Sequence, residues 1–228
     1  MNRQVYYRAI QTFKTKQRLS KKVIALVNSI RITMPRIGTR KLYYLLKSQL
    51  KSLRVGRDKL FKILKANNLL ITPKKKYHVT TDSHHRFRKH KNQIKNVEFI
   101  KPEQVWVSDI TYVGNRENPC YLALVTDAYS KKIMGYNISN SLNVEGSLKA
   151  LEMAISNRRY QQEPTIHHSD RGLQYCSNEY QKLLKHNAIS SSMTEKYDPY
   201  ENAIAERING ILKQEFAINK YDLSLIHI

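Results

Sequence analysis

The spacing of hydrophobic residues changes near residue 104. In the first part, apolar residues recur every three or four positions in three stretches, which predicts short amphipathic helices. The residues expected to face inward are Val23, Ile24, Val27 and Ile30, then Leu42, Leu45 and Leu46, then Leu60, Ile63 and Leu64. We expect Ser20 to cap the first helix, Thr39 to cap the second, and Gly56 to precede the third. Residues 1–19 are expected to form a further helix or an arm.

From Gln104 onward, runs rich in β-branched and aromatic residues predict β-strands. The expected strands are residues 105–113, 121–128, 132–139, 165–168 and 189–194. The expected helices are residues 144–155, 177–187 and 201–216. The first three strands follow one another with short links, as in an antiparallel meander. The order βββαβαβα therefore predicts an α/β (α+β) fold with a mixed five-stranded sheet.

Three acids in this second part form a candidate metal site. Asp109 interrupts the first predicted strand, where an acid is costly to bury unless it is paired or binds a metal. Asp170 follows the fourth strand and Glu206 lies on the last helix, with 35 residues between the two (206 − 170 − 1). Carboxylates from two strands and a helix suit hard cations such as Mg²⁺ or Mn²⁺. Two such ions promote in-line phosphoryl transfer.

The face of the last helix that carries Glu206 is polar. On a helical wheel, Asn202, Asn209 and Lys213 lie beside Glu206 and opposite the isoleucines that pack inward. The Glu206 carboxylate is therefore expected to point away from the packing face. Asn202 and Lys213 could contact substrate phosphates, or they could be solvated helix residues.

Two further residues near the acids have alternative interpretations. Asp127 ends the second strand, where capping of the following turn is favoured over a role in the site. His168 could orient substrate next to Asp170, or it could be a strand residue hydrogen-bonded to the backbone.

The motifs around these acids resemble those of a known family. The segments that carry the resemblance are Trp106-x-x-Asp109-Ile110-Thr111-Tyr112, Tyr121-Leu122 with Asp127, His168-Ser169-Asp170-Arg171-Gly172-x-Gln174-Tyr175, Ser192-Met193 and Asn202-Ala203-x-Ala205-Glu206. They resemble the D,D-35-E integrase core, and more closely the second-reading-frame product of bacterial insertion-sequence transposases of the IS-three type. One departure is Glu201, where that family usually has Asp.

The resemblance implies a ribonuclease-H-like core, which agrees with the predicted order of strands and helices. It also implies that Asp109, Asp170 and Glu206 are the catalytic and metal-binding residues, and that two Mg²⁺ or Mn²⁺ ions serve as cofactors. The implied reaction is cleavage of DNA strands at insertion-sequence ends, followed by strand transfer into a target.

Positive charge is concentrated in the first part of the chain. Residues 1–103 hold 27 Lys and Arg against 4 Asp and Glu, a net charge of +23, whereas residues 104–228 hold 13 against 14, a net charge of −1. So many uncompensated charges indicate a polyanionic partner, most simply DNA. The residues expected to contact DNA are Arg40, Lys41, Arg54, Arg57, Lys59, Lys62, Lys74, Lys75, Lys76 and Lys213.

The first part also has a candidate DNA-binding motif. Residues 35–42 resemble the helix-turn-helix-like segment that precedes the integrase core in this family. The alternative is a helical bundle without a DNA role, which acts as a spacer or a dimer contact.

These observations predict four segments: a basic helical, helix-turn-helix-like DNA-binding region (residues 1–71), a basic linker (72–103), a catalytic core (104–222) and a short tail (223–228). The tail, Leu-Ser-Leu-Ile-His-Ile, resembles the translation of a sequencing-library adapter, so we expect the natural chain to continue differently. Two cysteines indicate no disulfide framework, which fits a reducing cytoplasm. No apolar run is long enough to span a bilayer.

The expected function is that of a metal-dependent transposase. Its partners would be double-stranded DNA, both element ends and target, with a homo-oligomer and a fusion to the first-reading-frame product as further expectations. One alternative is a truncated, non-catalytic DNA-binding inhibitor of transposition. A third interpretation is a nuclease acting on RNA–DNA hybrids, against which the basic first part argues.

Overall fold

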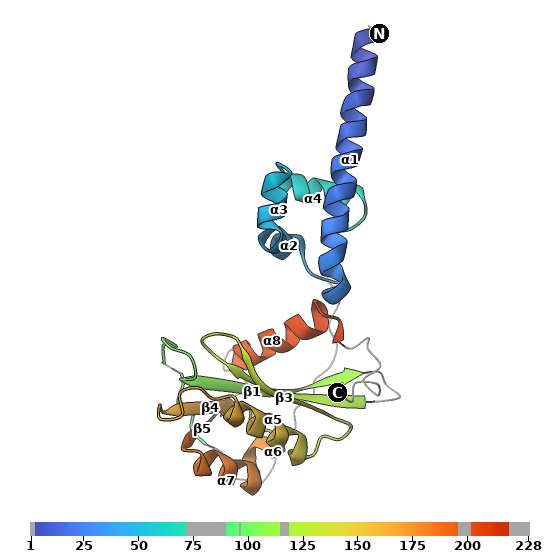
Figure 1. Cartoon of the computed structure of the whole chain (residues 1–228). Helices are drawn as coiled ribbons and strands as arrows, with labels where there is room; N and C mark the ends of the chain where they lie inside the picture. The colour runs from blue at the N-terminus through green and yellow to red at the C-terminus, as the bar shows by residue number, and fades with distance from the viewer. Residues whose placement is uncertain (1–2, 72–89, 96, 115–118, 196–201, 219–228) are drawn as a thin grey trace. The chain divides into compact units, whose positions relative to one another are not determined.

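The computed structural model describes residues 3–71, 90–95, 97–114, 119–195 and 202–218 (Figure 1). They form two compact units. The first holds the described residues up to position 71 together with Gln214–Ala217, and the second holds those from position 90 to Lys213 together with Ile218. Several predictions fall outside the described residues: most of the linker, with Lys74, Lys75 and Lys76, and the whole of the tail.

The first unit is helical. Its helices are α1 (Arg3–Thr33), α2 (Thr39–Leu45), α3 (Lys47–Ser52) and α4 (Arg57–Ala66). Their apolar faces meet in a core of Val23, Val27, Ile37, Leu42, Leu46, Leu50, Val55, Leu60 and Leu64. Most of the residues predicted to face inward are in this core or pack against it, but Leu45 is wrong, because 47% of its surface is exposed.

Three boundary predictions in this unit are wrong. Ser20 lies in the middle of α1 and not at its start, because no Pro or Gly between residues 3 and 33 interrupts the helix. Gly38 occupies the N-cap position of α2, so Thr39 is already the first helical residue. The second predicted helix is divided at Leu46, where the backbone leaves helical geometry (φ −96°, ψ 15°) between α2 and α3.

The second unit is built on a mixed five-stranded sheet. Its strands are β1 (Val105–Gly114), β2 (Pro119–Asp127), β3 (Ile133–Ser139), β4 (Thr165–Ser169) and β5 (Ile189–Met193), in the spatial order β3-β2-β1-β4-β5. The first three strands pair antiparallel, whereas β4 runs parallel to both β1 and β5. The predicted meander, sheet and α/β (α+β) class are therefore confirmed.

Helices cover both faces of this sheet (Figure 1). They are α5 (Val144–Ser156), α6 (Leu173–Cys176), α7 (Asn178–His186) and α8 (Ala203–Gln214). Helices α5, α6 and α7 lie on one face, and α8 lies on the other. The one-turn helix α6 was not predicted, because four residues are too short to show a period.

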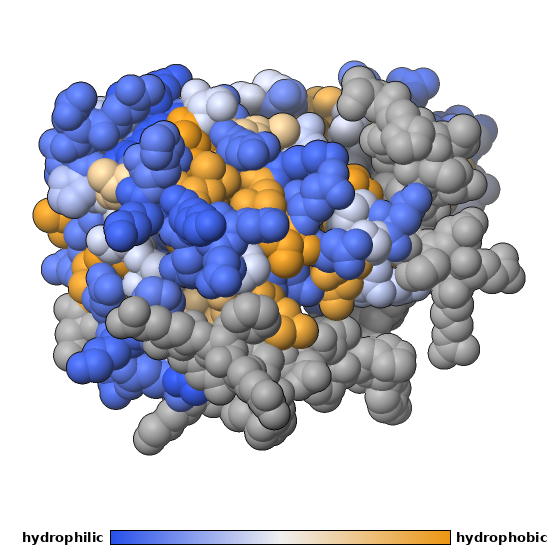
Figure 2. All heavy atoms as spheres, turned by 90° about the horizontal axis from the view of Figure 1, so that it is seen from below, coloured by the Kyte–Doolittle hydropathy of each residue, from blue (hydrophilic) through white to orange (hydrophobic). Residues whose placement is uncertain are grey.

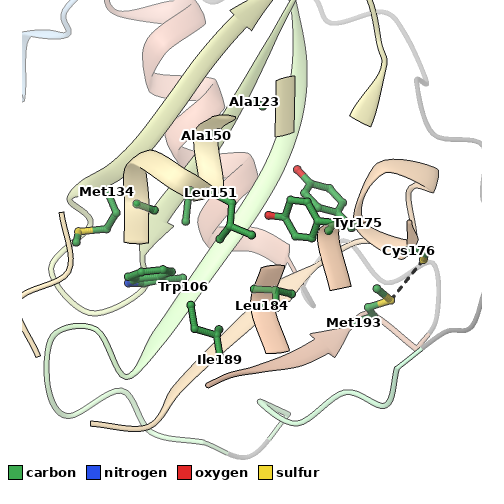
Figure 3. Close-up of a cluster of buried hydrophobic side chains, with 13 residues drawn as sticks. Trp106, Ala123, Met134, Ala150, Leu151, Tyr175, Cys176, Leu184, Ile189 and Met193 are labelled. Carbon is green, nitrogen blue, oxygen red and sulfur yellow. Dashed lines mark hydrogen bonds between the residues drawn. The ribbon is translucent and has the colours of Figure 1, made fainter. Parts of the chain in front are cut away.

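Each face of the sheet has its own core. Trp106, Met134, Leu151, Tyr180 and Leu184 belong to the larger cluster, between the sheet and the helices α5 to α7 (Figure 3). A smaller cluster joins residues of β1 and β2 to Ile208 and Leu212 of α8. The surface on the side of α5 to α7 mixes hydrophilic side chains with smaller hydrophobic areas, as amphipathic helices would leave it (Figure 2).

Gly135 in β3 allows α5 to pack closely on the sheet. A Cβ atom at this position would lie 2.0 Å from the Ala150 carbonyl oxygen and 2.6 Å from the Ala154 backbone nitrogen. Backbone atoms cannot rotate away, so we expect Gly135→Ala to lower the free energy of unfolding by about 2–3 kcal/mol in urea denaturation. Gly210→Ala in α8 is the control, since its Cβ would meet nothing within 4 Å; it should stabilise by about 0.5–1 kcal/mol. Equal effects of the two changes would contradict this explanation.

Candidate active site

The sheet brings the two predicted aspartates to neighbouring positions. β1 and β4 are adjacent and parallel, and the last residues paired between them are Val107 and His168. Asp109 and Asp170 each lie two residues beyond that pair, so both aspartates follow the point at which the pairing of β1 with β4 ends. Glu206 lies in the first turn of α8, and its side chain is exposed, as predicted.

Hydrogen bonds orient both aspartates. The Ile110 backbone N–H donates to Asp109 Oδ1 at 2.9 Å, and Asn209 Nδ2 donates to Asp109 Oδ2 at 2.7 Å. The Gly172 backbone N–H donates to Asp170 Oδ1 at 3.0 Å, so the turn after β4 fixes that carboxylate. A Cβ atom at Gly172 would approach the same oxygen to 3.0 Å, so a side chain at this position would press on the Asp170 carboxylate.

The three acids influence one another electrostatically. Burial is the largest cause that raises the pKa of Asp109, to about 7, and the nearby Asp170 carboxylate is the second. Glu206 adds a smaller contribution in the same direction, and the hydrogen bonds from Asn209 and Ile110 oppose the rise. The site therefore concentrates negative charge that a bound cation would relieve.

The donor chemistry fits a hard divalent cation, because every candidate ligand is a carboxylate oxygen. The geometry is less closed: among the described residues, no group of three or more His, Cys, Asp or Glu side chains is arranged to hold a metal ion. The carboxylates would have to draw closer for all three to bind one ion.

The raised pKa of Asp109 predicts a pH-dependent stability. The unfolded chain loses the Asp109 proton near pH 3.8, whereas the folded protein keeps it to about pH 7. In metal-free buffer this residue therefore lowers the free energy of unfolding as the pH rises from about 4 to 7, with no further change above. Allowing for partial exposure, Asp109→Asn should be more stable than the wild type by about 1–2 kcal/mol at pH 8, and by less at pH 5. Denaturant titrations in EDTA at pH 5 and pH 8 measure the free energy of unfolding of both proteins. An Asp109→Asn variant less stable than the wild type at pH 8 would refute the raised pKa of Asp109.

One expectation about α8 is corrected. Asn202 and Asn209 were placed with Glu206 on the face that points away from the core, but both are buried. The reason is that this part of α8 lies over a polar stretch of β1. Asn202 Nδ2 donates to the Ser108 carbonyl oxygen at 3.2 Å, while Asn209 contacts Asp109.

Buried polar groups lie beside the aspartates. His167 Nε2 is 2.7 Å from Ser108 Oγ and 2.9 Å from the Tyr180 hydroxyl. Burial, and then His168, lower the pKa of His167 to about 3, so the ring is neutral. Burial raises the pKa of Tyr175, with contributions from Tyr180, Asp109 and Asp170, so this hydroxyl stays protonated near the site.

The remaining candidates near the acids have identifiable contacts. His168 is fully buried, and its Nδ1 lies 2.9 Å from Ser192 Oγ. Asp127 is also fully buried and accepts the Ser130 backbone N–H at 2.7 Å, which confirms its role in the turn. It also accepts the Glu103 backbone N–H at 2.8 Å.

The sequence did not reveal Asn209 as the partner of Asp109, nor Tyr175 as a neighbour of both aspartates. The available signal for Asn209 was its position one helical turn after Glu206. Tyr175 stood inside the Asp170 motif, but nothing in its spacing indicated which way the ring would face.

The candidate DNA-contacting residues of the first unit lie on its surface. Those with exposed side chains are Arg40, Lys41, Arg54, Arg57, Lys59 and Lys62, on α2, α4 and the segment between α3 and α4. Two of them have acidic partners: Lys41 Nζ lies 2.5 Å from Glu215 Oε1, and Arg57 Nε lies 3.1 Å from Asp58 Oδ1. Lys213, in the last turn of α8, is half-buried. Among the described residues, no helix is both long and apolar enough to cross a membrane.

Residues 100–199 match the family model of the integrase core domain. A 31 kDa protein of insertion element IS600 from Shigella sonnei is 39% identical over 165 residues, which are 71% of this chain and 59% of that protein. The transposase for insertion sequence element IS629 from Shigella sonnei is 39% identical over 52% of this chain and 40% of its own length. Transposase InsF for insertion sequence IS3A from Escherichia coli K12 is 40% identical over 50% of this chain and 39% of its own length.

A solved structure, the HTLV-2 integrase catalytic core domain in complex with magnesium, is similar with a TM-score of 0.42 and 23% sequence identity. The matched region covers 56% of this chain and 76% of the HTLV-2 integrase chain. The mixed five-stranded sheet and the match of residues 100–199 to the integrase core domain agree with the expected ribonuclease-H-like fold. More particularly, the chain is a relative of bacterial insertion-sequence transposases. It spans between 39% and 59% of the length of these curated relatives.

Proposed function

We propose that this protein is a divalent-metal-dependent polynucleotidyl transferase that cleaves the ends of an insertion sequence and joins them to target DNA. Two observations support the proposal: Asp109 and Asp170 each lie two residues beyond the last pair between β1 and β4, and the Asp170 and Glu206 carboxylates both help to raise the pKa of Asp109. Asp109 and Asp170 lie within the segment that matches the integrase core domain, and Glu206 follows seven residues after its end (206 − 199).

Each acid has a distinct part in this proposal. Asp109 and Asp170 would hold the cation from the sheet, with their carboxylates oriented by Asn209, Ile110 and Gly172. Glu206, exposed on α8, would complete the ligand set from the helix. Bound Mg²⁺ or Mn²⁺, as two ions, would supply an activated attacking oxygen and stabilise the leaving oxygen of the cleaved strand.

The basic first unit would supply most of the DNA affinity. Its exposed Arg and Lys side chains can neutralise phosphates without reading bases, and this positions the duplex. Lys213, one helical turn beyond Asn209 on α8, would contribute a further phosphate contact near the acids. The homo-oligomer and the fusion to a first-reading-frame product stay predictions.

The alternative is a protein that occupies element ends without cutting them. One observation favours it: among the described residues, no three acids are arranged to hold a metal ion. The two proposals differ in whether divalent cations draw the acids together.

Incubation of the chain with duplex DNA that carries the element ends, in Mg²⁺ or Mn²⁺, tests the proposal. We expect nicks at the element boundaries that require the metal and are absent in EDTA. Tight binding without metal-dependent nicks would favour the non-catalytic alternative. Preferential cutting of an RNA–DNA hybrid of the same sequence would instead indicate a nuclease of the ribonuclease H kind.

A further inference from the structure

A buried amide connects the helix that carries Glu206 to the carboxylate of Asp109. Asn209 is 5% exposed, and its Nδ2 lies 2.7 Å from Asp109 Oδ2. Asn202, seven residues earlier, is 8% exposed and donates to the Ser108 carbonyl oxygen. Ala205 is buried between them and packs with Val105 and Val107, so Asn202, just before α8, and two positions on α8 face β1.

The contact to Asp109 is of a different kind from the contact to Ser108. The Ser108 carbonyl group already has a fixed direction within the strand, so Asn202 holds the helix against β1 without orienting a side chain. A carboxylate can rotate about its Cβ–Cγ bond. The Ile110 N–H fixes one of its oxygens and Asn209 fixes the other, so together they set the plane of the carboxylate.

The two hydrogen bonds leave lone pairs of the Asp109 carboxylate available to a cation. Each carboxylate oxygen has two lone-pair sites, and the protein occupies one on each oxygen. The orientation of the amide is also determined, because its oxygen would repel the carboxylate if the group were turned over. Asn209 Oδ1 is buried and has no hydrogen-bond partner among the described residues. The contact with Asp109 is therefore the interaction that orients the amide.

We propose that Asn209 is a positioning residue, which holds the Asp109 carboxylate in the orientation of a cation ligand and ties it to the helix that carries Glu206. The inference rests on the proposed function, because it assumes that the acids bind a divalent cation. The hydrogen-bond partners of metal ligands commonly change metal affinity tenfold or more when they are removed. A residue that only filled space would have no such effect.

Direct measurement of Mn²⁺ binding to the full chain, from the electron paramagnetic resonance signal of free Mn²⁺ at pH 8, tests the proposal. Asn209→Leu keeps the branched shape and volume but removes the donor, and Asn209→Ala removes both. We expect both variants to weaken Mn²⁺ binding about tenfold or more. The Mn²⁺ concentration for half-maximal strand cleavage should rise by the same factor.

A matched control is Asn157→Ala at the C-cap of α5. Asn157 Nδ2 donates to the Met134 carbonyl oxygen at 2.9 Å, so the change removes a similar side-chain hydrogen bond that involves none of the three acids. It should leave Mn²⁺ affinity within about twofold of the wild type, since it touches no ligand. Circular dichroism melts of all variants in EDTA identify any that do not fold. If Asn209→Leu does not fold, Asn209→Ala carries the test.

Three outcomes are decisive. Weaker Mn²⁺ binding by both Asn209 variants, with Asn157→Ala unchanged, supports the positioning role. Wild-type Mn²⁺ affinity in a folded Asn209→Leu variant, when Asp109→Asn has lost binding, overturns the inference and leaves the proposed function intact. An absence of Mn²⁺ binding by the wild type itself overturns both.

Discussion

Replacement of any one of the three acids should abolish strand cleavage. We expect Asp109→Asn, Asp170→Asn and Glu206→Gln each to reduce the rate by a factor of about 1,000 or more, because an amide oxygen carries no charge to hold the cation. Duplex DNA affinity should stay within about twofold of the wild type, since the excess of positive over negative charge lies before residue 104. A gel assay of nicked strands and a fluorescence anisotropy titration on the same duplex measure the two quantities.

The control for this prediction is an acid of the same unit that lies outside the site. Glu179 is exposed in the first turn of α7, and Glu179→Gln should cleave at the wild-type rate. Full activity of any one of the three acid variants in Mg²⁺ would remove that residue from the site. Loss of DNA binding together with cleavage would show that the acid stabilises the fold.

These variants also separate catalysis from stability. Asp109→Asn should be the more stable protein at pH 8 without metal, because the wild type carries a carboxylate whose charge is disfavoured by burial and by Asp170. A variant that is inactive but more stable than its parent cannot owe its inactivity to unfolding. Loss of activity together with a gain in stability is expected where a fold keeps like charges close together for function.

The sequence predicted the second unit well because its signals are local. Strand runs such as residues 105–113 are rich in β-branched and aromatic residues, and the turn residue Gly172 placed Asp170 at a strand tip. The parallel pairing of β1 with β4 follows from the fold, and it brings two acids together that are 60 residues apart (170 − 109 − 1).

What the sequence could not show was which face of α8 would be buried. A helical wheel ranks positions by hydrophobicity, and on that basis Asn202 and Asn209 belong with Glu206 on the exposed side. The face is buried because β1 presents Ser108 and the Asp109 carboxylate, which need hydrogen-bond donors. When polar residues of a helix are buried against polar groups of another element, the spacing of residues in the helix alone cannot reveal it.

In the first unit, the errors concern where helices begin and end. Ser20 was read as a cap because serine favours that position, but the residues before it are just as compatible with a helix. Leu45 fits the apolar spacing of the second helix, but Leu42 and Leu46 face the core and Leu45 lies on the exposed side. In both cases a local sequence signal did not decide the position of the residue in the fold.

Removal of four charges from the first unit should weaken DNA binding and flatten its salt dependence. The changes are to glutamine at Arg54, Arg57, Lys59 and Lys62, all of which have exposed side chains on α4 or just before it. Each phosphate that is no longer neutralised should reduce the slope of log K against log salt by about 0.9, so four such phosphates should reduce it by about 3 to 4. Anisotropy titrations of the full chain between roughly 50 and 300 mM salt would measure the slope. This is roughly the range over which counterion release dominates the salt dependence.

The matched control removes four exposed charges from the second unit instead. Glutamine at Lys132, Lys149, Lys182 and Lys185 changes the net charge of the chain by the same amount. If only the total charge mattered, both variants would lose affinity alike. If α4 and the segment before it track the phosphates, the first variant should lose affinity at 150 mM salt by about a hundredfold or more, while the control stays close to the wild type. Equal losses would show that the duplex is held by the field of the whole chain and that the basic helical unit has no special place in binding.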